Sequence, residues 1–151
     1  MIRIILSDIF NAFGEGCEAI CHQVNCQGVM NSGLAKDISK VYPEVKEDYK
    51  ALCMEQGTKS LLGTYLDTPV EHGRIISIFG QAYYGKDGRR YTSYEALARA
   101  FGILNQTYAG KCLAFPYGFG CGLGGGDWSI VIKLMQDCFT NCDINIYKVE
   151  R

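Results

Sequence analysis

The sequence has few of the residues and motifs on which several common kinds of site depend. It contains 2 histidines, 3 prolines and 1 tryptophan in 151 residues. Two histidines alone do not complete a tetrahedral zinc site. No G-x-x-x-x-G-K-[ST] or G-x-S-x-G pattern occurs. The sequence therefore excludes a P-loop nucleotide site and the nucleophile elbow of α/β-hydrolases.

Charge and long hydrophobic runs are also sparse. The formal net charge is −1, from 15 Lys and Arg against 16 Asp and Glu. This balance argues against an electrostatic nucleic-acid surface. No apolar run is long enough to cross a membrane, and residues 1–6 lack the layout of a signal peptide. We expect a cytoplasmic protein with no membrane partner.

The 8 cysteines need a separate explanation. Without a secretory signal, their thiols are expected to be reduced. Their spacing does not match a zinc knuckle, so we expect no metal and no cofactor. Most are interpreted as small buried apolar residues. Cys26 and Cys121 fall in candidate site loops, and their reactivity is the one worth checking.

Alternating apolar runs predict one α/β domain over residues 1–151. Strands interleaved with helices indicate a largely parallel sheet covered on both faces. About six strands are expected, at 2–6, 17–24, 61–66, 74–79, 111–115 and 144–149. Four helices are expected, at 34–41, 43–55, 127–139 and from a capping box at 92–95 to about residue 108. Ligands of such folds bind beyond the carboxyl ends of the strands.

A glycine-rich stretch is the strongest local signal. Five of the seven residues from Gly120 to Gly126 are glycine, between a predicted strand and a predicted helix. Glycine permits positive φ angles and lets the backbone approach a ligand closely. Amides that turn outward together in such a loop can hold a phosphate. A plain connection needs fewer glycines than this.

A second loop, 25–33, follows the same strand–loop–helix order. It carries Asn25, Asn31 and Ser32, neutral groups suited to sugar hydroxyls. Ser32 is also placed to cap the following helix. Two such loops in one small domain indicate a ligand gripped from both sides.

Residues 120–125 also satisfy G-x-G-x-x-G. A dinucleotide fingerprint follows the first strand of a βαβ unit and needs an acidic residue on a later strand. Here too little chain follows, so we do not interpret the match as a Rossmann motif.

Taken together, the two loops resemble those of macro domains. The resemblance covers nearly the whole chain and is closest to small phage and bacterial members that process ADP-ribose 1″-phosphate. It rests on the segments Ile20-Cys21-His22-Gln23-Val24-Asn25-Cys26-Gln27-Gly28, Asn31-Ser32-Gly33-Leu34-Ala35, Ser60-Leu61-Leu62-Gly63, Tyr91-Thr92-Ser93-Tyr94-Glu95-Ala96-Leu97, Phe115-Pro116 and 120–128. It implies a three-layer α/β/α fold with a mixed central sheet.

The resemblance implies ADP-ribose or a derivative as ligand. Asp8 would accept a hydrogen bond from the adenine amino group, with Ile9 beside it; from the residues alone, a turn role is favoured for Asp8. Asn25 would contact the distal ribose. The diphosphate would lie against Ser32, Gly33 and Leu34 on one side and against Phe119, Gly120, Cys121, Gly122, Leu123 and Gly124 on the other.

For catalysis, the resemblance points to His22, Asn25 and Asp127. A histidine can donate or accept a proton near neutral pH, although His22 is as readily a core histidine on a buried strand. Asp127 is also the expected N-cap of the last helix.

Three functions stay open at this stage. The first is an ADP-ribose 1″-phosphate phosphatase, and the second is a binding module without turnover. The third is a glycohydrolase that releases ADP-ribose from macromolecules. Related glycohydrolases use a lysine and an aspartate at the places held here by Gln81 and Gly124, so that route needs Lys86 or Asp127 to substitute. The loop 80–90 is long enough to act as a lid.

Overall fold

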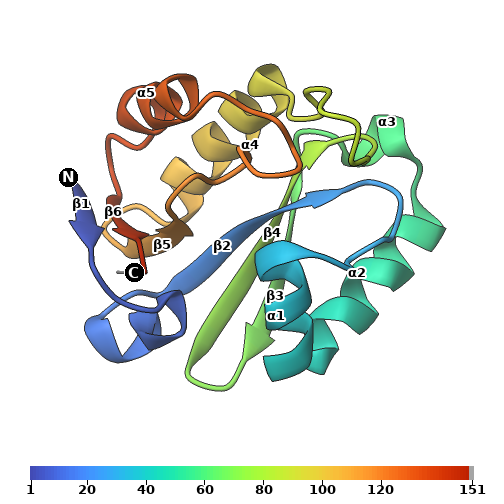
Figure 1. The fold of residues 1–151 in the computed structure, drawn as a ribbon. Helices are drawn as coiled ribbons and strands as arrows, with labels where there is room; N and C mark the ends of the chain where they lie inside the picture. Colours follow the sequence, from blue (N-terminus) through green and yellow to red (C-terminus); the bar gives the residue numbers. More distant parts are fainter. Residues whose placement is uncertain (150–151) are drawn as a thin grey trace.

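A computed structural model describes residues 1–149 as one mixed sheet with helices on both faces (Figure 1). Within these residues the sheet has 6 strands in the order β1-β6-β5-β2-β4-β3. Their bounds are β1 Ile2–Ile5, β2 Ala19–Asn25, β3 Tyr65–Val70, β4 Gly73–Gln81, β5 Cys112–Pro116 and β6 Asp143–Tyr147. Only β3 runs antiparallel to its neighbour. The predicted three-layer α/β architecture is confirmed.

The helices divide between the two faces of the sheet. Helices α4 (Tyr94–Thr107) and α5 (Trp128–Cys138) cover one face. The 3₁₀ helix η1 (Ile9–Glu15), with α1 (Gly33–Val41) and α2 (Pro43–Glu55), covers the other. Alternate residues of β2 serve the two layers, since Ala19 and Cys21 pack under α4 while Ile20 and Val24 pack under η1 and α1. The inner strand β2 is therefore buried on both sides, as the inner strands of parallel sheets are.

The third predicted strand differs in the structure. The apolar run at 61–66 was expected to be a strand, but it is divided: α3 (Thr58–Leu61) ends there and β3 begins only at Tyr65. Gly63 turns the chain with a φ of 88°, and periodicity cannot separate such short apolar runs. Pro69 lies within β3. That strand is at the sheet edge, where a missing N–H costs no ladder bond.

Helix starts also differ in detail. The capping box expected at 92–95 is wrong by one residue, because the N-cap is Ser93, whose hydroxyl accepts from Ala96 N at 3.2 Å. Thr92 instead donates its hydroxyl hydrogen to Gly120 O at 2.7 Å. Helix η1 was not expected at all. Its N-cap is Asp8, which is a local signal for a helix start.

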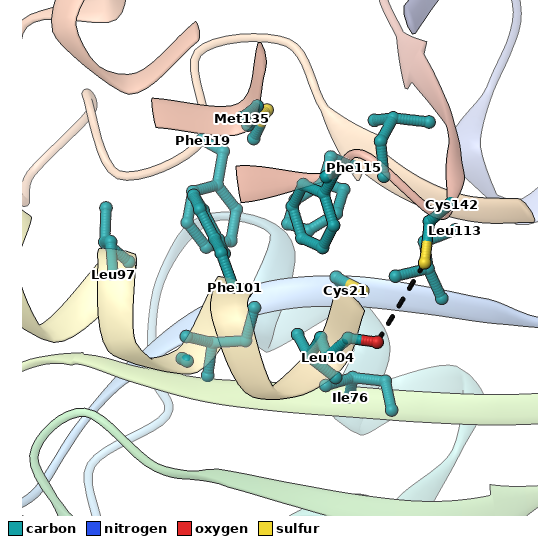
Figure 2. Close-up of a cluster of buried hydrophobic side chains, with 14 of the residues drawn as sticks. Cys21, Ile76, Leu97, Phe101, Leu104, Leu113, Phe115, Phe119, Met135 and Cys142 are labelled. Carbon is teal, nitrogen blue, oxygen red and sulfur yellow. Dashed lines mark hydrogen bonds between the residues drawn. The ribbon is translucent and has the colours of Figure 1, made fainter. Parts of the chain in front are cut away.

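An aromatic cluster fills the layer between the sheet and α4–α5 (Figure 2). The Phe101 ring centroid lies 5.7 Å from that of Phe115 and 5.0 Å from that of Phe139. Phe115 in turn meets Phe119 edge to face at 5.2 Å. Because Phe119 opens the glycine loop, this core fixes the loop to the sheet.

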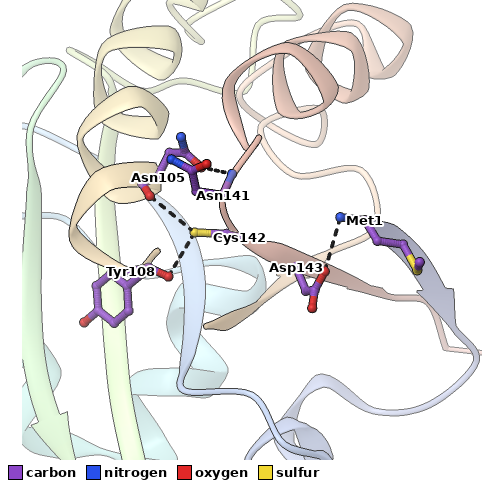
Figure 3. A network of polar contacts seen from close by, with 6 residues as sticks. All are labelled: Met1, Asn105, Tyr108, Asn141, Cys142 and Asp143. Atoms are coloured by element: carbon purple, nitrogen blue, oxygen red, sulfur yellow. Dashed lines mark hydrogen bonds and ion pairs between the residues drawn. The ribbon is translucent and has the colours of Figure 1, made fainter. Parts of the chain in front are cut away.

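Polar contacts fasten the last strand to its neighbours (Figure 3). Asn141 N donates to Asn105 Oδ1 at 2.7 Å, and the Cys142 thiol donates to Tyr108 O at 3.1 Å. The N-terminal ammonium pairs with Asp143 at 3.2 Å. The start of β6 is thereby joined both to α4 and to β1.

We expect Phe101→Ala to lower the free energy of unfolding by about 3–5 kcal/mol, because it opens a cavity in the aromatic cluster. Urea denaturation measures the change. Ile103→Ala on the same helix is the control, since Ile103 is 44% exposed, and its effect should stay within about 0.5 kcal/mol. Equal losses in both variants would contradict this account of the core.

Candidate functional site

A groove runs along the carboxyl ends of the parallel strands. It consists of three cavities of about 310, 280 and 360 Å³. We name them after the Asn25 side chain, the glycine loop 118–126 and the Asp8 side chain that line them. The Asn25 and glycine-loop cavities share Gln23, Ser32, Ala35, Gln81 and Leu123. The glycine-loop and Asp8 cavities share Leu34, Pro116 and Tyr117. The three are therefore one continuous site.

Asp8 lies at one end of the groove, in the wall of its cavity with Ile9. Its Oδ1 accepts from Phe10 N at 2.9 Å and caps η1. The turn interpretation of Asp8 is thus confirmed. The same carboxylate keeps Oδ2 free of any hydrogen bond within residues 1–149, so it can also accept from a ligand.

Several glycine-loop amides face no partner. The loop is closed on itself by Gly126 N donating to Gly120 O at 2.9 Å. Within the described chain, five amides of this loop donate no hydrogen bond: those of Gly118, Gly120, Gly122, Leu123 and Gly124. The amides of Phe119 and Cys121 are already bonded, to Pro116 O and Gly118 O. Unbonded amides that line a cavity are donors available to an anion.

The N-terminus of α1 lies across the groove from this loop. Ser32, Gly33 and Leu34 line the glycine-loop cavity. Ser32 is the N-cap residue, but its side chain makes no capping bond, so the capping role considered for it is wrong. The first turn of a helix carries free amides and a positive partial charge. Both sides of the cavity therefore favour an anionic group.

Asn25 organises the loop that forms its cavity. Its Nδ2 donates to Val29 O at 2.8 Å, and its Oδ1 accepts from Gln27 N at 2.9 Å and from the Tyr49 hydroxyl at 2.9 Å. Lys86 is the only charged residue among those lining this cavity. The residues that line this end of the groove thus offer a positive charge and no carboxylate.

Gln23 lies where two of the cavities join. Its Nε2 donates to Gln81 Oε1 at 2.7 Å and to Thr92 Oγ1 at 2.8 Å. Its Oε1 is buried and has no partner among the described residues. Sequence reasoning missed Gln23 as a site residue. The signal was its place at the carboxyl end of a buried strand, one residue after His22.

His22 is buried at 1% exposure and lines the glycine-loop cavity. Its Nε2 is hydrogen bonded to Ser77 Oγ at 2.7 Å, while Nδ1 has no partner within the described chain. Burial lowers the pKa of His22 from 6.5 to about 3, because desolvation disfavours the imidazolium. Without ligand, His22 is neutral at physiological pH.

Two other candidates lie away from the groove. Asp127 lines none of the three cavities. Its Oδ1 accepts from the backbone N and the hydroxyl of Ser129 at 2.9 and 2.7 Å, which confirms it as the cap of α5. These bonds to Ser129 lower the pKa of the Asp127 carboxyl. Cys121 also lines none of the three cavities, and its thiol hydrogen is directed at Phe119 O, 3.3 Å away.

Neither loop cysteine is an activated thiol. Burial raises the pKa of Cys26 to about 11. Burial is also the main reason why the pKa of Cys121 is raised, with the Asp127 carboxylate adding to it. Low-pKa thiolates are the reactive form, so these two residues are structural.

The loop 80–90 borders the Asn25 cavity through Tyr84, Gly85 and Lys86. Its base is closed by a bridge between Gln81 and Thr92. Tyr91 N and Thr92 N both donate to Gly124 O, at 2.8 and 2.9 Å. The carboxyl end of this loop is therefore hydrogen bonded to the glycine loop, and its middle residues line the groove.

Residues 1–149 contain no group of three or more His, Cys, Asp and Glu side chains arranged to hold a metal ion. In the same residues, no helix has the length and apolar character needed to cross a bilayer.

The comparisons with known proteins give a fold relationship. No family model matches the sequence. An uncharacterized 17.5 kDa protein from the tk-vs intergenic region of enterobacteria phage T4 is 26% identical over 153 residues, covering 97% of this chain and 95% of that protein. A protein of unknown function from Bacteroides thetaiotaomicron superposes with a TM-score of 0.85 at 22% identity, covering 97% of both chains.

Two further solved structures carry informative names. The macrodomain of Mycobacterium tuberculosis DarG gives a TM-score of 0.80 at 23% identity over 99% of both chains. Thermosipho africanus DarTG in complex with ADP-ribose gives 0.79 at 22% identity, over 97% of this chain and 41% of that one. This chain therefore has the macro domain fold, as the sequence resemblance predicted.

We expect His22 to make stability depend on pH in a defined window. Its folded pKa lies below the unfolded value, so its contribution is complete above pH 6.5 and is lost as the pH falls towards about 3. Between these values the wild type should lose up to about 1.4 kcal/mol per pH unit more than His22→Gln does. Urea unfolding at several pH values measures this difference. Parallel pH profiles would show that His22 is not held neutral by burial.

Proposed function

We propose that this protein binds ADP-ribose derivatives along the groove and removes the phosphate of ADP-ribose 1″-phosphate. One observation carries the proposal. Unbonded amides line the middle of a continuous groove that has an acceptor carboxylate at one end and a lone lysine at the other. A structure with the same fold was solved in complex with ADP-ribose.

The groove matches the parts of this ligand in order. The adenine amino group would donate to Asp8, with Ile9 beside the ring. The diphosphate would lie between the N-terminus of α1 and the free amides of the glycine loop, where neutral donors and the helix dipole favour an anion. The distal ribose would reach the Asn25 cavity. Phe119 and Cys121, whose amides are already bonded, would contribute by shaping the loop.

Lys86 favours the 1″-phosphate among the possible distal groups. A phosphate on the distal ribose adds negative charge at the end of the ligand that enters the Asn25 cavity. Lys86 is the only charge that lines this cavity, so attraction to the phosphate has no carboxylate to oppose it. The glycohydrolase alternative needs an acid here as well as a lysine, and Asp127 does not line the groove.

The reaction itself breaks one P–O bond. A water oxygen bonds to phosphorus and gives up a proton, and the distal ribose leaves with the bridging oxygen, which takes up a proton. His22 is our candidate for the proton carrier through its unpartnered Nδ1. A bound diphosphate next to His22 favours the imidazolium, so ligand binding raises its pKa from the low value of the empty site. We assign Asp127 to capping α5 and not to catalysis.

A binding module without turnover is the second candidate. The neutral, Ser77-bonded state of His22 favours it. Calorimetric titration with ADP-ribose, followed by a phosphate-release assay on ADP-ribose 1″-phosphate, separates the two. Binding with release that His22→Ala abolishes supports the phosphatase. Binding without release supports the module, and absence of binding would refute both.

Asp8→Ala should weaken ADP-ribose binding by at least several-fold, because the adenine amino group loses its acceptor. Isothermal titration calorimetry measures the affinity. Asp48→Ala is the control, since Asp48 is an exposed aspartate on α2 and lines none of the three cavities. Equal affinity in the Asp8 variant and the wild type would remove Asp8 from the site.

Lys86→Gln should impair turnover of ADP-ribose 1″-phosphate much more than binding of ADP-ribose. We expect roughly tenfold or greater loss of kcat/KM for ADP-ribose 1″-phosphate, in line with the loss of one charged partner of a phosphate. Affinity for ADP-ribose should change less than about twofold on the same argument. Lys50→Gln, on an exposed part of α2, is the matched control. A uniform loss for both ligands would contradict a specific role at the distal phosphate.

A further inference from the structure

Two cysteine sulfurs are in contact near the amino ends of β2 and β5, away from the groove at the carboxyl ends of the strands. Cys17 Sγ and Cys112 Sγ lie 3.4 Å apart, although the residues are 95 positions apart in the chain. Cys17 follows η1, and Cys112 is the first residue of β5. Glu18 N donates to Cys112 O at 2.8 Å, so the two segments run side by side. Ala19 lies opposite Leu113 in the pairing of β2 with β5, so Cys112 lies opposite Glu18, the residue after Cys17.

The surroundings of Cys17 favour a thiolate. Its pKa is lowered from 9.0 to about 7, first by the hydrogen bond from Cys112 and further by Tyr147 and Asn145, against the opposing effects of burial and Glu15. Asn145 Nδ2 donates to Cys17 Sγ at 3.5 Å, and the Tyr147 hydroxyl lies 3.9 Å from the same sulfur. Thiolates, not thiols, react with oxidants.

The surroundings of Cys112 favour the protonated thiol. Its hydrogen bond to Cys17 is the main reason why its pKa is raised, burial adds to this, and Asp143 raises it while Arg3 lowers it. When one sulfur of the pair ionises, the thiolate is therefore favoured at Cys17 and the thiol at Cys112. In such an arrangement one sulfur reacts first and the other resolves the product.

We propose that Cys17 and Cys112 are a peroxide-reactive modification site that closes to a disulfide. The Cys17 thiolate attacks one oxygen of hydrogen peroxide, the O–O bond breaks, and Cys17 becomes a sulfenic acid while hydroxide takes a proton to form water. The Cys112 sulfur then attacks the sulfenic sulfur, and the S–O bond breaks. The hydroxyl leaves as water with the Cys112 proton, so two thiols lose two electrons and one peroxide gives two waters.

Access and competition favour this pair. Cys17 is 5% exposed and Cys112 is half-buried, which suits an oxidant as small as peroxide. No other cysteine pair in residues 1–149 is hydrogen bonded sulfur to sulfur. Burial raises the pKa of Cys21 and of Cys26, and both are therefore poor competitors for the oxidant.

Peptide mapping after peroxide treatment tests the proposal directly. Remaining thiols are alkylated under denaturing conditions, and we expect a mass loss of two hydrogen atoms and a linked peptide pair containing Cys17 and Cys112. Cys112→Ser should abolish the link and leave a sulfenic acid at Cys17 that dimedone traps. Cys138→Ser, at a half-buried cysteine in α5, should leave the link intact. No linked peptide, or a link between other cysteines, would overturn the proposal.

The pH dependence of disulfide formation is a second readout. The rate should rise through about pH 7, following the Cys17 thiolate. A rate that rises only near pH 9, where an ordinary thiol ionises, would assign the reaction to an unperturbed cysteine instead. This measurement and the mapping need no ligand.

The effect on ligand binding rests on the proposed function. Tyr147 lines the Asp8 cavity, and closing the disulfide draws the Cys17 sulfur away from its hydroxyl. We expect oxidised protein to bind ADP-ribose several-fold more weakly, and the Cys112→Ser variant to be insensitive to peroxide. Unchanged affinity with a mapped disulfide would refute this coupling alone. If reduced protein binds no ADP-ribose, the proposed function fails and the mapped disulfide stands.

Discussion

The side-chain amide of Gln23 is the constraint on which the groove depends. It lies at the end of a strand that is buried on both faces, where a polar group without partners costs about 1–3 kcal/mol. Its hydrogen bonds to Gln81 and Thr92, and that of Thr92 to Gly120 O, join the carboxyl ends of β2 and β4, the base of the loop 80–90 and the glycine loop. Moving any one of these segments leaves a buried donor or acceptor unpaired. The groove is therefore held in one shape before a ligand arrives, which reduces the ordering cost of binding.

The same network explains much of the glycine content. A Cβ on Gly124 would lie 2.6 Å from Thr92 Oγ1, and one on Gly126 would lie 2.7 Å from Gly120 O. A Cβ on Gly80 would collide with Gln23. These glycines allow the loops to approach one another, whereas Gly120 and Gly125 supply positive φ angles of 74° and 70°. A Cβ on Gly122 would meet nothing within 4 Å.

The part of this arrangement that follows from sequence is the part set by periodicity and by local chemistry. Double-sided burial of the strands, the cap at Asp127 and the two loops at the carboxyl edge could all be predicted. The start of β3 at Tyr65 could not be predicted, because Gly63, in a left-handed conformation, divides an apolar run at 61–66 that looks continuous. The role of Gln23 also could not be predicted, since its partners are 58 and 69 residues away. Five glycines in one loop indicated a ligand site. They did not indicate that Gly124 and Gly126 are also required for close contacts with Thr92 and Gly120.

The sheet order has a consequence for how this chain folds. Strand β1 lies at the sheet edge, and its only strand neighbour is β6, with Ile2 opposite Ile144. The earliest strand in the chain is thus paired by the latest one. Forming contacts between residues this distant in sequence has a large entropic cost of loop closure, and it slows folding. During synthesis, residues 2–5 remain an unpaired edge until β6 has left the ribosome, so this sheet can be completed only after all six strands have been synthesised.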